Sequence, residues 1–136
     1  MLTVITGGTR GIGAATAHRL AADGHDLVLG YASDDDAAES TARAVREHGH
    51  DVNLVRADLT TDAGVDLLFG RAAEVGTVTG LVNNAGATLS IGPLAEASTD
   101  VVRRTVDLNL TAAILDRKST RLNSSHRTVS RMPSSA

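Results

Sequence analysis

The sequence predicts an α/β fold, a doubly wound parallel sheet that stops after about four βα units. Two observations lead to this prediction. Short runs rich in Val, Leu and Ile alternate with longer helical stretches, the pattern of a parallel sheet with helices on both faces. The first run leads directly into a glycine-rich turn, which is followed by a helix. Right-handed crossovers then build the first half of a doubly wound sheet.

We expect the strands to cover residues 2–5, 26–31, 51–57 and 78–82. The helices are expected from Gly11 to Gly24, from a Ser33 cap to Gly49, over residues 62–75, and from a Ser98 cap to near Leu115.

Glycine and acidic residues set the expected helix ends. Gly24 suits the left-handed position after a helix. Asp34, Asp35 and Asp36 fall in the first turn after Ser33, where carboxylates favour the helix dipole. Gly64 and Gly70 weaken the helix over residues 62–75, each by roughly 1 kcal/mol relative to Ala.

Composition bounds the function. The 136 residues are enough for one domain, and the 42% of hydrophobic residues can supply its core. The absence of cysteine excludes disulfides and thiolate metal sites, and the five histidines show no ligand spacing. No run of ~18 apolar residues and no secretory pattern is present, so we expect a cytoplasmic protein with no membrane contact. The net charge of -3 argues against nucleic acid as a partner.

A change in composition divides the chain at residue 116. Residues 1–115 form the expected domain, whereas residues 116–136 hold five of the 13 basic residues and one of the 16 acidic ones. Apolar residues in that segment follow no helical or strand period, so we expect a disordered tail.

The tail also has an explanation at the nucleotide level. DRKSTRLNSSH and SRMPSSA each correspond to one reading frame of the two ends of a standard high-throughput sequencing adapter. We therefore interpret residues 116–136 as adapter read-through joined to a truncated gene. The alternative is a natural basic tail that binds an acidic partner.

The glycine turn indicates an anion site. Gly7 suits a tight turn, Gly11 lets a pyrophosphate approach the backbone, and Gly13 lets the helix pack against the strand. A P-loop is excluded because it needs a Lys in the turn, and the only Lys is Lys118. The alternative is a glycine-rich turn that binds nothing.

Four motifs in order resemble the short-chain dehydrogenase/reductase family over residues 1–115. Its T-G-x-x-x-G-x-G turn matches TGGTRGIG from Thr6 to Gly13, and its N-N-A-G block matches Asn83, Asn84, Ala85 and Gly86. Its adenine-contacting acid matches Asp58, and the Asn of its catalytic tetrad matches Asn109. The 3-oxoacyl-carrier-protein reductase type is the most similar subfamily. The resemblance implies a Rossmann-like NAD(P)-dependent oxidoreductase that moves hydride between nicotinamide and a carbonyl or alcohol.

The resemblance also implies the site. The expected cofactor-binding residues are Thr6, Gly7, Thr9, Arg10, Gly11, Ile12, Gly13, Tyr31, Ser33, Asp58, Leu59, Asn83, Asn84, Ala85 and Gly86. Asn109 is the one expected catalytic residue, and its backbone carbonyl would hold a water in the proton relay. Simpler roles stay open at three places: Asp58 as a loop cap, the N-N-A-G block as a polar turn, and Asn109 as a solvated helix residue.

Two features favour NADP over NAD. The position where NAD enzymes place a ribose-binding acid is occupied by Tyr31, followed by Ala32 and Ser33. Arg10 can pair with a 2′-phosphate. Asp34, Asp35 and Asp36 point the other way, and we interpret them as the start of a helix.

The sequence lacks the family's Tyr-x-x-x-Lys and its strand-five Ser, since the only Tyr is Tyr31. We therefore expect an inactive chain whose VTGLV strand (residues 78–82) forms an exposed edge that favours aggregation. The full-length parent is expected to be a homo-oligomer. The alternatives are a non-catalytic dinucleotide-binding or sensing module, or a flavodoxin-like domain.

Overall fold

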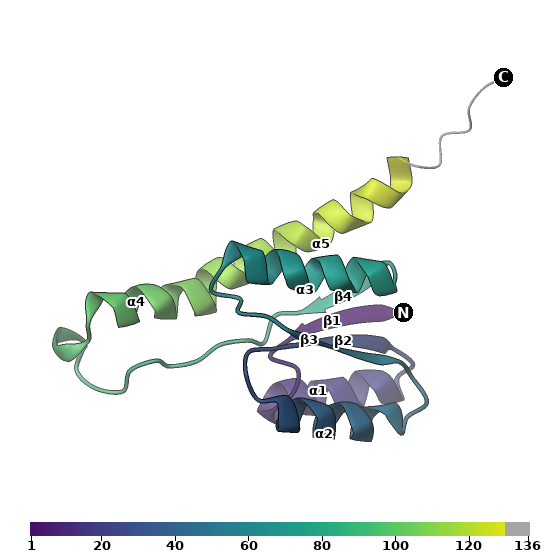
Figure 1. Cartoon of the computed structure of the whole chain (residues 1–136), viewed down its shortest axis with the longest axis horizontal. Coiled ribbons are helices and arrows are strands. Elements are labelled where there is room, and N and C mark those ends of the chain that lie inside the picture. The colour runs from purple at the N-terminus through teal and green to yellow at the C-terminus, as the bar shows by residue number, and fades with distance from the viewer. Residues whose placement is uncertain (130–136) are drawn as a thin grey trace.

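A computed structural model of the chain describes the backbone of residues 1–129 and the side chains of residues 1–120. A single parallel sheet lies between two layers of helices (Figure 1). The strands are β1 (Leu2–Thr6), β2 (Asp26–Tyr31), β3 (Val52–Arg56) and β4 (Val78–Val82). The α-helices are α1 (Gly11–Ala22), α2 (Asp35–Arg46), α3 (Asp62–Val75), α4 (Thr99–Val106) and α5 (Ala112–Val129).

The strand order is β3-β2-β1-β4, and every neighbouring pair is parallel. Val4 of β1 lies opposite Val28 on one side and Leu81 on the other. The chain first winds outward from β1 to β3 and then returns to the other side of β1. This reversal creates a crevice at the carboxyl ends of β1 and β4, as doubly wound sheets require. The predicted fold class is therefore confirmed.

Alternate residues of β1 point to opposite faces, and both faces are covered. On one face, Val4 joins a cluster with Leu68 and Phe69 of α3; on the other, Ile5 joins a cluster with Leu27 and small residues of α1 and α2. All five residues of β1 are buried. On the face covered by α1 and α2, the helices place alanines against the sheet. Aliphatic side chains fill the rest of this second cluster, with no aromatic residue among its buried members.

The start of α3 matches its prediction, and the structure explains one of its glycines. The Thr61 hydroxyl caps the helix by accepting from the Gly64 amide at 3.0 Å. A Cβ at Gly64 would collide with the Asp58 carbonyl, so the close approach of the preceding loop requires glycine there.

Helix α2 differs from its prediction at both ends. Asp34, not Ser33, is the cap, because its carboxylate accepts from the Ala37 amide at 3.0 Å. The helix ends at Arg46, and Gly49 lies in the following turn with φ +84°. Asp35 and Asp36 do occupy the first turn.

The predicted fourth helix is two α-helices joined by a π-helical segment at Asp107–Thr111. Ser98 caps α4 as predicted, by accepting from the Val101 amide at 3.3 Å. The backbone is then helical to Val129. The disorder expected for residues 116–136 stays a prediction. The stretch of residues 116–129 contains no Gly or Pro and several good helix formers, and it continues a helix whose nucleation is already complete. Residues 130–136 of the expected tail lie outside the described residues.

One carboxylate on α5 is poorly placed. Asp116 is only 1% exposed, and its Oδ1 atom has no hydrogen-bond partner. Helix α5 packs against α3 and β4, which leaves this side chain inside the packed structure. Burial raises the pKa of the Asp116 carboxyl to about 6.

Replacement of Asp116 by Asn should stabilise the chain above pH 6. The folded carboxyl has a higher pKa than the unfolded one, so the free energy of unfolding of the wild type rises as pH falls from above 6 toward 4. We expect Asp116→Asn to raise that free energy by roughly 1–3 kcal/mol at pH 8 and by much less at pH 4.5. Urea denaturation at both pH values measures the difference. Asp66→Asn, at an exposed position of α3, is the control, and an equal effect there would contradict the explanation.

Candidate functional site

The glycine turn joins β1 to α1 at the crevice of the sheet. Gly7 and Gly11 have φ values of +63° and +52°, a conformation that favours glycine. A Cβ on Gly11 would meet nothing within 4 Å, so this side of the turn is open. A Cβ on Gly13 would collide with the Gly7 carbonyl and lie 2.6 Å from the Asn84 amide nitrogen. The three glycines thus provide the turn, an open approach and close packing.

The N-terminus of α1 has no side-chain cap. Arg10 occupies the capping position with an extended backbone and makes no capping hydrogen bond, and no acidic residue lies in the first turn. Helices α2, α3 and α4 are all capped by side chains. The amides of the first turn of α1 and the positive end of its dipole are therefore available to an anion in the crevice.

The polar block after β4 is bonded to the end of β1. The Thr6 hydroxyl accepts from the amides of Asn84 and Ala85 at 3.1 and 3.0 Å. The Asn84 side-chain amide donates to the carbonyls of Thr6 and Gly7 at 3.1 and 3.0 Å. We call these four hydrogen bonds the Thr6–Asn84 lock. It fixes the position of the N-N-A-G block beside the glycine turn.

The other two asparagines of the predicted site, Asn83 and Asn109, bond to helical segments or to the loop beside them. Asn83 donates to the Ala113 carbonyl at 3.1 Å. Asn109 lies in the π-helical segment, where it donates to the carbonyls of Ala87 and Thr105 at 2.9 and 2.8 Å. Asn109 therefore ties this segment to the loop after the N-N-A-G block.

A cleft of about 690 Å³ opens above the crevice. The predicted site residues that line it are Gly7, Thr9, Arg10, Ile12, Tyr31, Ser33, Asp58, Leu59, Asn84, Ala85 and Gly86. The predicted residues that do not line it are Thr6, Gly11, Gly13, Asn83 and Asn109. Of these, Thr6 supports the wall from behind through the Thr6–Asn84 lock.

Sequence reasoning missed several lining residues, namely Gly30, Ala32, Ala57, Thr60, Ala87, Leu89, Arg104 and Leu108. Some could have been predicted, because Gly30, Ala32, Ala57 and Thr60 are sequence neighbours of the expected cofactor-binding residues. Arg104 belongs to no motif and reaches the cleft only because α4 packs near it. Its location could not be read from spacing.

Asp58 serves its own loop and faces the cleft. Its Oδ1 atom accepts from the hydroxyl and the amide of Thr60 at 2.7 and 3.0 Å. These hydrogen bonds, aided by the positive charge of Arg104, lower the pKa of the Asp58 carboxyl. Asp58 is therefore ionised at neutral pH, and the simpler role of loop cap holds alongside its position in the cleft.

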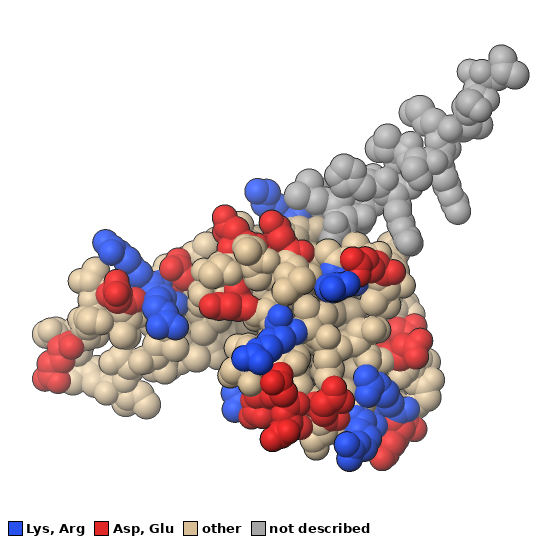
Figure 2. All heavy atoms as spheres, in the orientation of Figure 1, with Lys and Arg blue, Asp and Glu red and all other residues tan. Residues whose placement is uncertain are grey.

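Acids and arginines are paired where β2 ends. The Tyr31 hydroxyl donates to Asp35 at 2.8 Å, which raises the pKa of Tyr31. Asp35 also pairs with Arg56 at 3.2 Å, and Asp34 pairs with Arg10 at 3.5 Å. Figure 2 shows acidic side chains gathered over the layer of α1 and α2, with basic side chains beside them.

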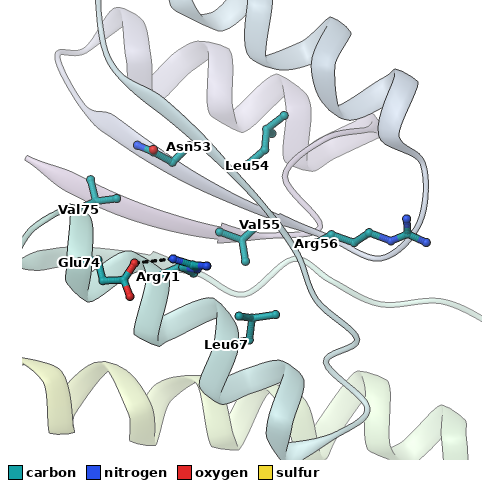
Figure 3. Close-up of a pocket in the computed structure, with 8 residues that line it drawn as sticks. All are labelled: Asn53, Leu54, Val55, Arg56, Leu67, Arg71, Glu74 and Val75. Atoms are coloured by element: carbon teal, nitrogen blue, oxygen red, sulfur yellow. Dashed lines mark hydrogen bonds and ion pairs between the residues drawn. The ribbon is translucent and has the colours of Figure 1, made fainter.

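A second hollow of about 450 Å³ lies between β3 and α3 (Figure 3). It contains none of the predicted site residues. Its α3 charges, Arg71 and Glu74, pair with each other at 2.9 Å. Neither a helix N-terminus nor a glycine turn opens into it, so the cleft above the crevice is the better candidate.

The described residues offer neither a membrane span nor a metal-binding cluster. No helix among them is long and apolar enough to cross a membrane. No group of three or more His, Cys, Asp or Glu side chains in this part of the chain could hold a metal ion.

A family model described as short chain dehydrogenase matches residues 2–120. The chain belongs to the short-chain dehydrogenase family. The match confirms the family resemblance and extends it five residues beyond the expected limit at residue 115.

Relatives agree with this assignment. The chain is 39% identical over 109 residues to 3beta-hydroxysteroid dehydrogenase 1 of Eggerthella lenta, covering 79% of this chain and 41% of that protein. A short chain dehydrogenase from Burkholderia cenocepacia in complex with NADP superposes with a TM-score of 0.84 at 33% identity, over 88% of this chain and 49% of the other. An NADH-dependent reductase in complex with NAD gives 0.84 at 29% identity, over 95% and 55%. The chain spans less than half the length of the curated relatives it matches.

Gly13 should not tolerate a methyl group, although helix propensity favours Ala. We expect Gly13→Ala to lower the free energy of unfolding by roughly 1–3 kcal/mol, because the Gly7 carbonyl and the Asn84 amide must move. Gly70→Ala is the matched control, since its Cβ would meet nothing within 4 Å. That substitution should stabilise α3 by up to about 1 kcal/mol. Urea denaturation of both variants checks the contrast, and a neutral or stabilising Gly13→Ala would contradict it.

Proposed function

We propose that this chain is the dinucleotide-binding part of an NAD(P)-dependent oxidoreductase that transfers hydride between nicotinamide and a carbonyl or alcohol. The observation that carries the proposal is the uncapped N-terminus of α1, which opens into the cleft beside a glycine turn. Amides at that point suit a pyrophosphate. Gly7, Thr9, Arg10 and Ile12 of the turn and the helix start line the cleft, whereas Gly11 does not.

The remaining contacts follow from position in the cleft. Asp58 and Leu59 would hold the adenine, Tyr31 and Ser33 would face its ribose, and Asn84, Ala85 and Gly86 would line the path toward the nicotinamide. The bound cofactor supplies a hydride at the nicotinamide ring. Asn109 would keep the loop after Gly86 in place through its hydrogen bond to Ala87.

We propose NADP as the preferred cofactor. No acid occupies the end of β2, where Tyr31, Ala32 and Ser33 line the cleft. Arg10 lines the same cleft, and its side chain is 73% exposed and able to meet a 2′-phosphate.

Binding of NADPH tests both proposals. We expect the 136-residue chain to bind NADPH and 2′,5′-ADP, and Arg10→Ala to weaken both by roughly tenfold through loss of a charge-assisted contact. NADH binding should change little. Arg19→Ala removes an exposed arginine from the same helix and serves as the control. Calorimetry measures the affinity of the wild type and of each variant for the three nucleotides. Absence of any nucleotide binding would overturn the function, and an unchanged NADPH affinity in Arg10→Ala would overturn the role of Arg10.

We propose that the chain as given performs no turnover. Its only tyrosine is Tyr31, whose hydroxyl is bonded to Asp35, and its only lysine is Lys118. No Tyr-x-x-x-Lys is present to move a proton to or from the substrate oxygen. The same absence favours a second candidate function, a dinucleotide-binding or sensing module without chemistry.

A turnover assay checks this directly. We expect no oxidation of NADPH above background when the purified chain is mixed with small ketones and aldehydes, even where calorimetry detects cofactor binding. Sustained NADPH oxidation coupled to alcohol formation would contradict the proposal.

We propose an adapter origin for residues 116–136, with Asp116 as the observation that supports it and the family match over residues 116–120 as the observation against it. A carboxylate without a partner at a packed position is the local conflict expected where an unrelated segment continues a helix. In the preceding turn of α5, Ala112 and Leu115 instead pack with the core.

We propose that the full-length parent is a cytoplasmic homo-oligomer. Val102, Val106, Leu110 and Ile114 recur every four residues along α4, the π-helical segment and α5, and each is at least 39% exposed. A row of exposed aliphatic side chains supports contact with further protein surface.

A further inference from the structure

Arg10, the cation proposed to meet the 2′-phosphate, already has a carboxylate partner. Its Nη1 atom lies 3.5 Å from Oδ2 of Asp34, the residue directly after the cleft-lining Ser33. Both side chains reach solvent, at 73% exposure for Arg10 and 42% for Asp34. A phosphate that enters the cleft therefore meets an arginine that is already paired with the carboxylate of Asp34.

Asp34 cannot easily move away from Arg10. Its other oxygen, Oδ1, accepts from the Ala37 amide at 3.0 Å as the cap of α2. Helix α2 is tied in turn to the glycine turn, because the Thr41 hydroxyl donates to the carbonyl of Thr9, the residue before Arg10, at 2.8 Å. The carboxylate of Asp34 is thus held beside Arg10 by two hydrogen bonds, neither of which involves the Arg10 guanidinium.

The next acid has other partners. Asp35 accepts from Tyr31 at 2.8 Å and pairs with Arg56 at 3.2 Å, while Arg56 also donates to the Ala32 carbonyl at 3.2 Å. Its charge is therefore compensated by a different arginine. Of the two acids, only Asp34 forms an ion pair with Arg10.

We propose that Asp34 competes with the 2′-phosphate of NADPH for Arg10 and thereby limits the selectivity of the cleft for NADPH over NADH. This inference rests on the proposed NADP-binding function. The phosphate dianion would have to displace Asp34 from Arg10 and would also approach a fixed like charge. NADH carries no phosphate at that position, so its affinity is independent of Asp34.

The decisive variants remove the negative charge of residue 34 and keep a side chain that can cap α2. Asn and Ser both cap helices about as well as Asp, so Asp34→Asn and Asp34→Ser leave α2 intact while releasing Arg10. We expect each variant to bind NADPH and 2′,5′-ADP roughly two- to fivefold more tightly than the wild type at low salt, the range expected for an exposed ion pair. NADH affinity should not change.

Two further variants isolate the mechanism. Asp36→Asn removes the same charge from the same helical turn but leaves the Arg10–Asp34 pair in place. It should affect NADPH binding clearly less than Asp34→Asn. In an Arg10→Ala background, Asp34→Asn should lose most of its effect, since no arginine remains to be released.

Calorimetry on the full 136-residue chain measures these affinities with NADPH, NADH and 2′,5′-ADP. Tighter NADPH binding confined to the Asp34 variants and dependent on Arg10 supports the proposal. Equal gains in Asp34→Asn and Asp36→Asn, an effect that survives Arg10→Ala, or weaker NADPH binding in both Asp34 variants would overturn it. A wild type that binds NADPH and NADH but shows no dependence on Asp34 refutes this inference alone. A wild type that binds no nucleotide refutes the proposed function and the inference with it.

Discussion

The Thr6–Asn84 lock is the interaction on which the cleft depends. Parallel strands β1 and β4 end side by side, and from there the chain departs in different directions, so the terminal backbone groups need partners outside the ladder. A hydroxyl that accepts from two amides and an amide that donates to two carbonyls supply those partners at one point. Thr6 is 1% exposed, so unpaired groups there would be costly to bury.

The lock also explains why the glycines are needed together. Asn84 reaches the Gly7 carbonyl only because nothing larger than hydrogen projects from Gly13 into the same space. The packing of α1 onto the turn then places its uncapped N-terminus over the crevice. Thr6, Gly7, Gly13 and Asn84 thus act as one structural unit, and the anion site at the start of α1 is a consequence of their packing.

Local patterns were sufficient to predict the sheet, because its determinants are short in range. Runs of Val, Leu and Ile and the residues that end them gave all four strands, and Thr61 and Gly76 bound a helix found at its predicted residues. The cleft-lining members of the two family motifs were also within reach, since each adjoins the carboxyl end of a strand. Helix ends were harder to predict where adjacent residues such as Ser33 and Asp34 could both act as cap.

Contacts between distant elements could not be predicted in this way. The hydrogen bond from Thr41 to Thr9 spans 32 residues, and Arg104 enters the cleft from a helix that carries no recognisable cofactor motif. The π-helical segment likewise makes a distant contact, because Asn109 donates to the carbonyl of Ala87, 22 residues earlier. These features depend on the distance between elements after folding, on which residue spacing carries no information.

The charged residues after β2 show how the sequence pattern and the folded structure have to be considered together. In the sequence, Arg10 and the acidic run after Ser33 look like opposing indications of the cofactor. In the folded chain they belong to one set of pairs, in which Arg10 faces Asp34 and Arg56 faces Asp35. The quantity that matters for a phosphate is then the free energy of exchanging one anionic partner of Arg10 for another. Arg10 and Asp34 are both partly exposed to solvent, so the free energy of this exchange is small. A neutral capping residue in place of Asp34 is therefore enough to favour the phosphate.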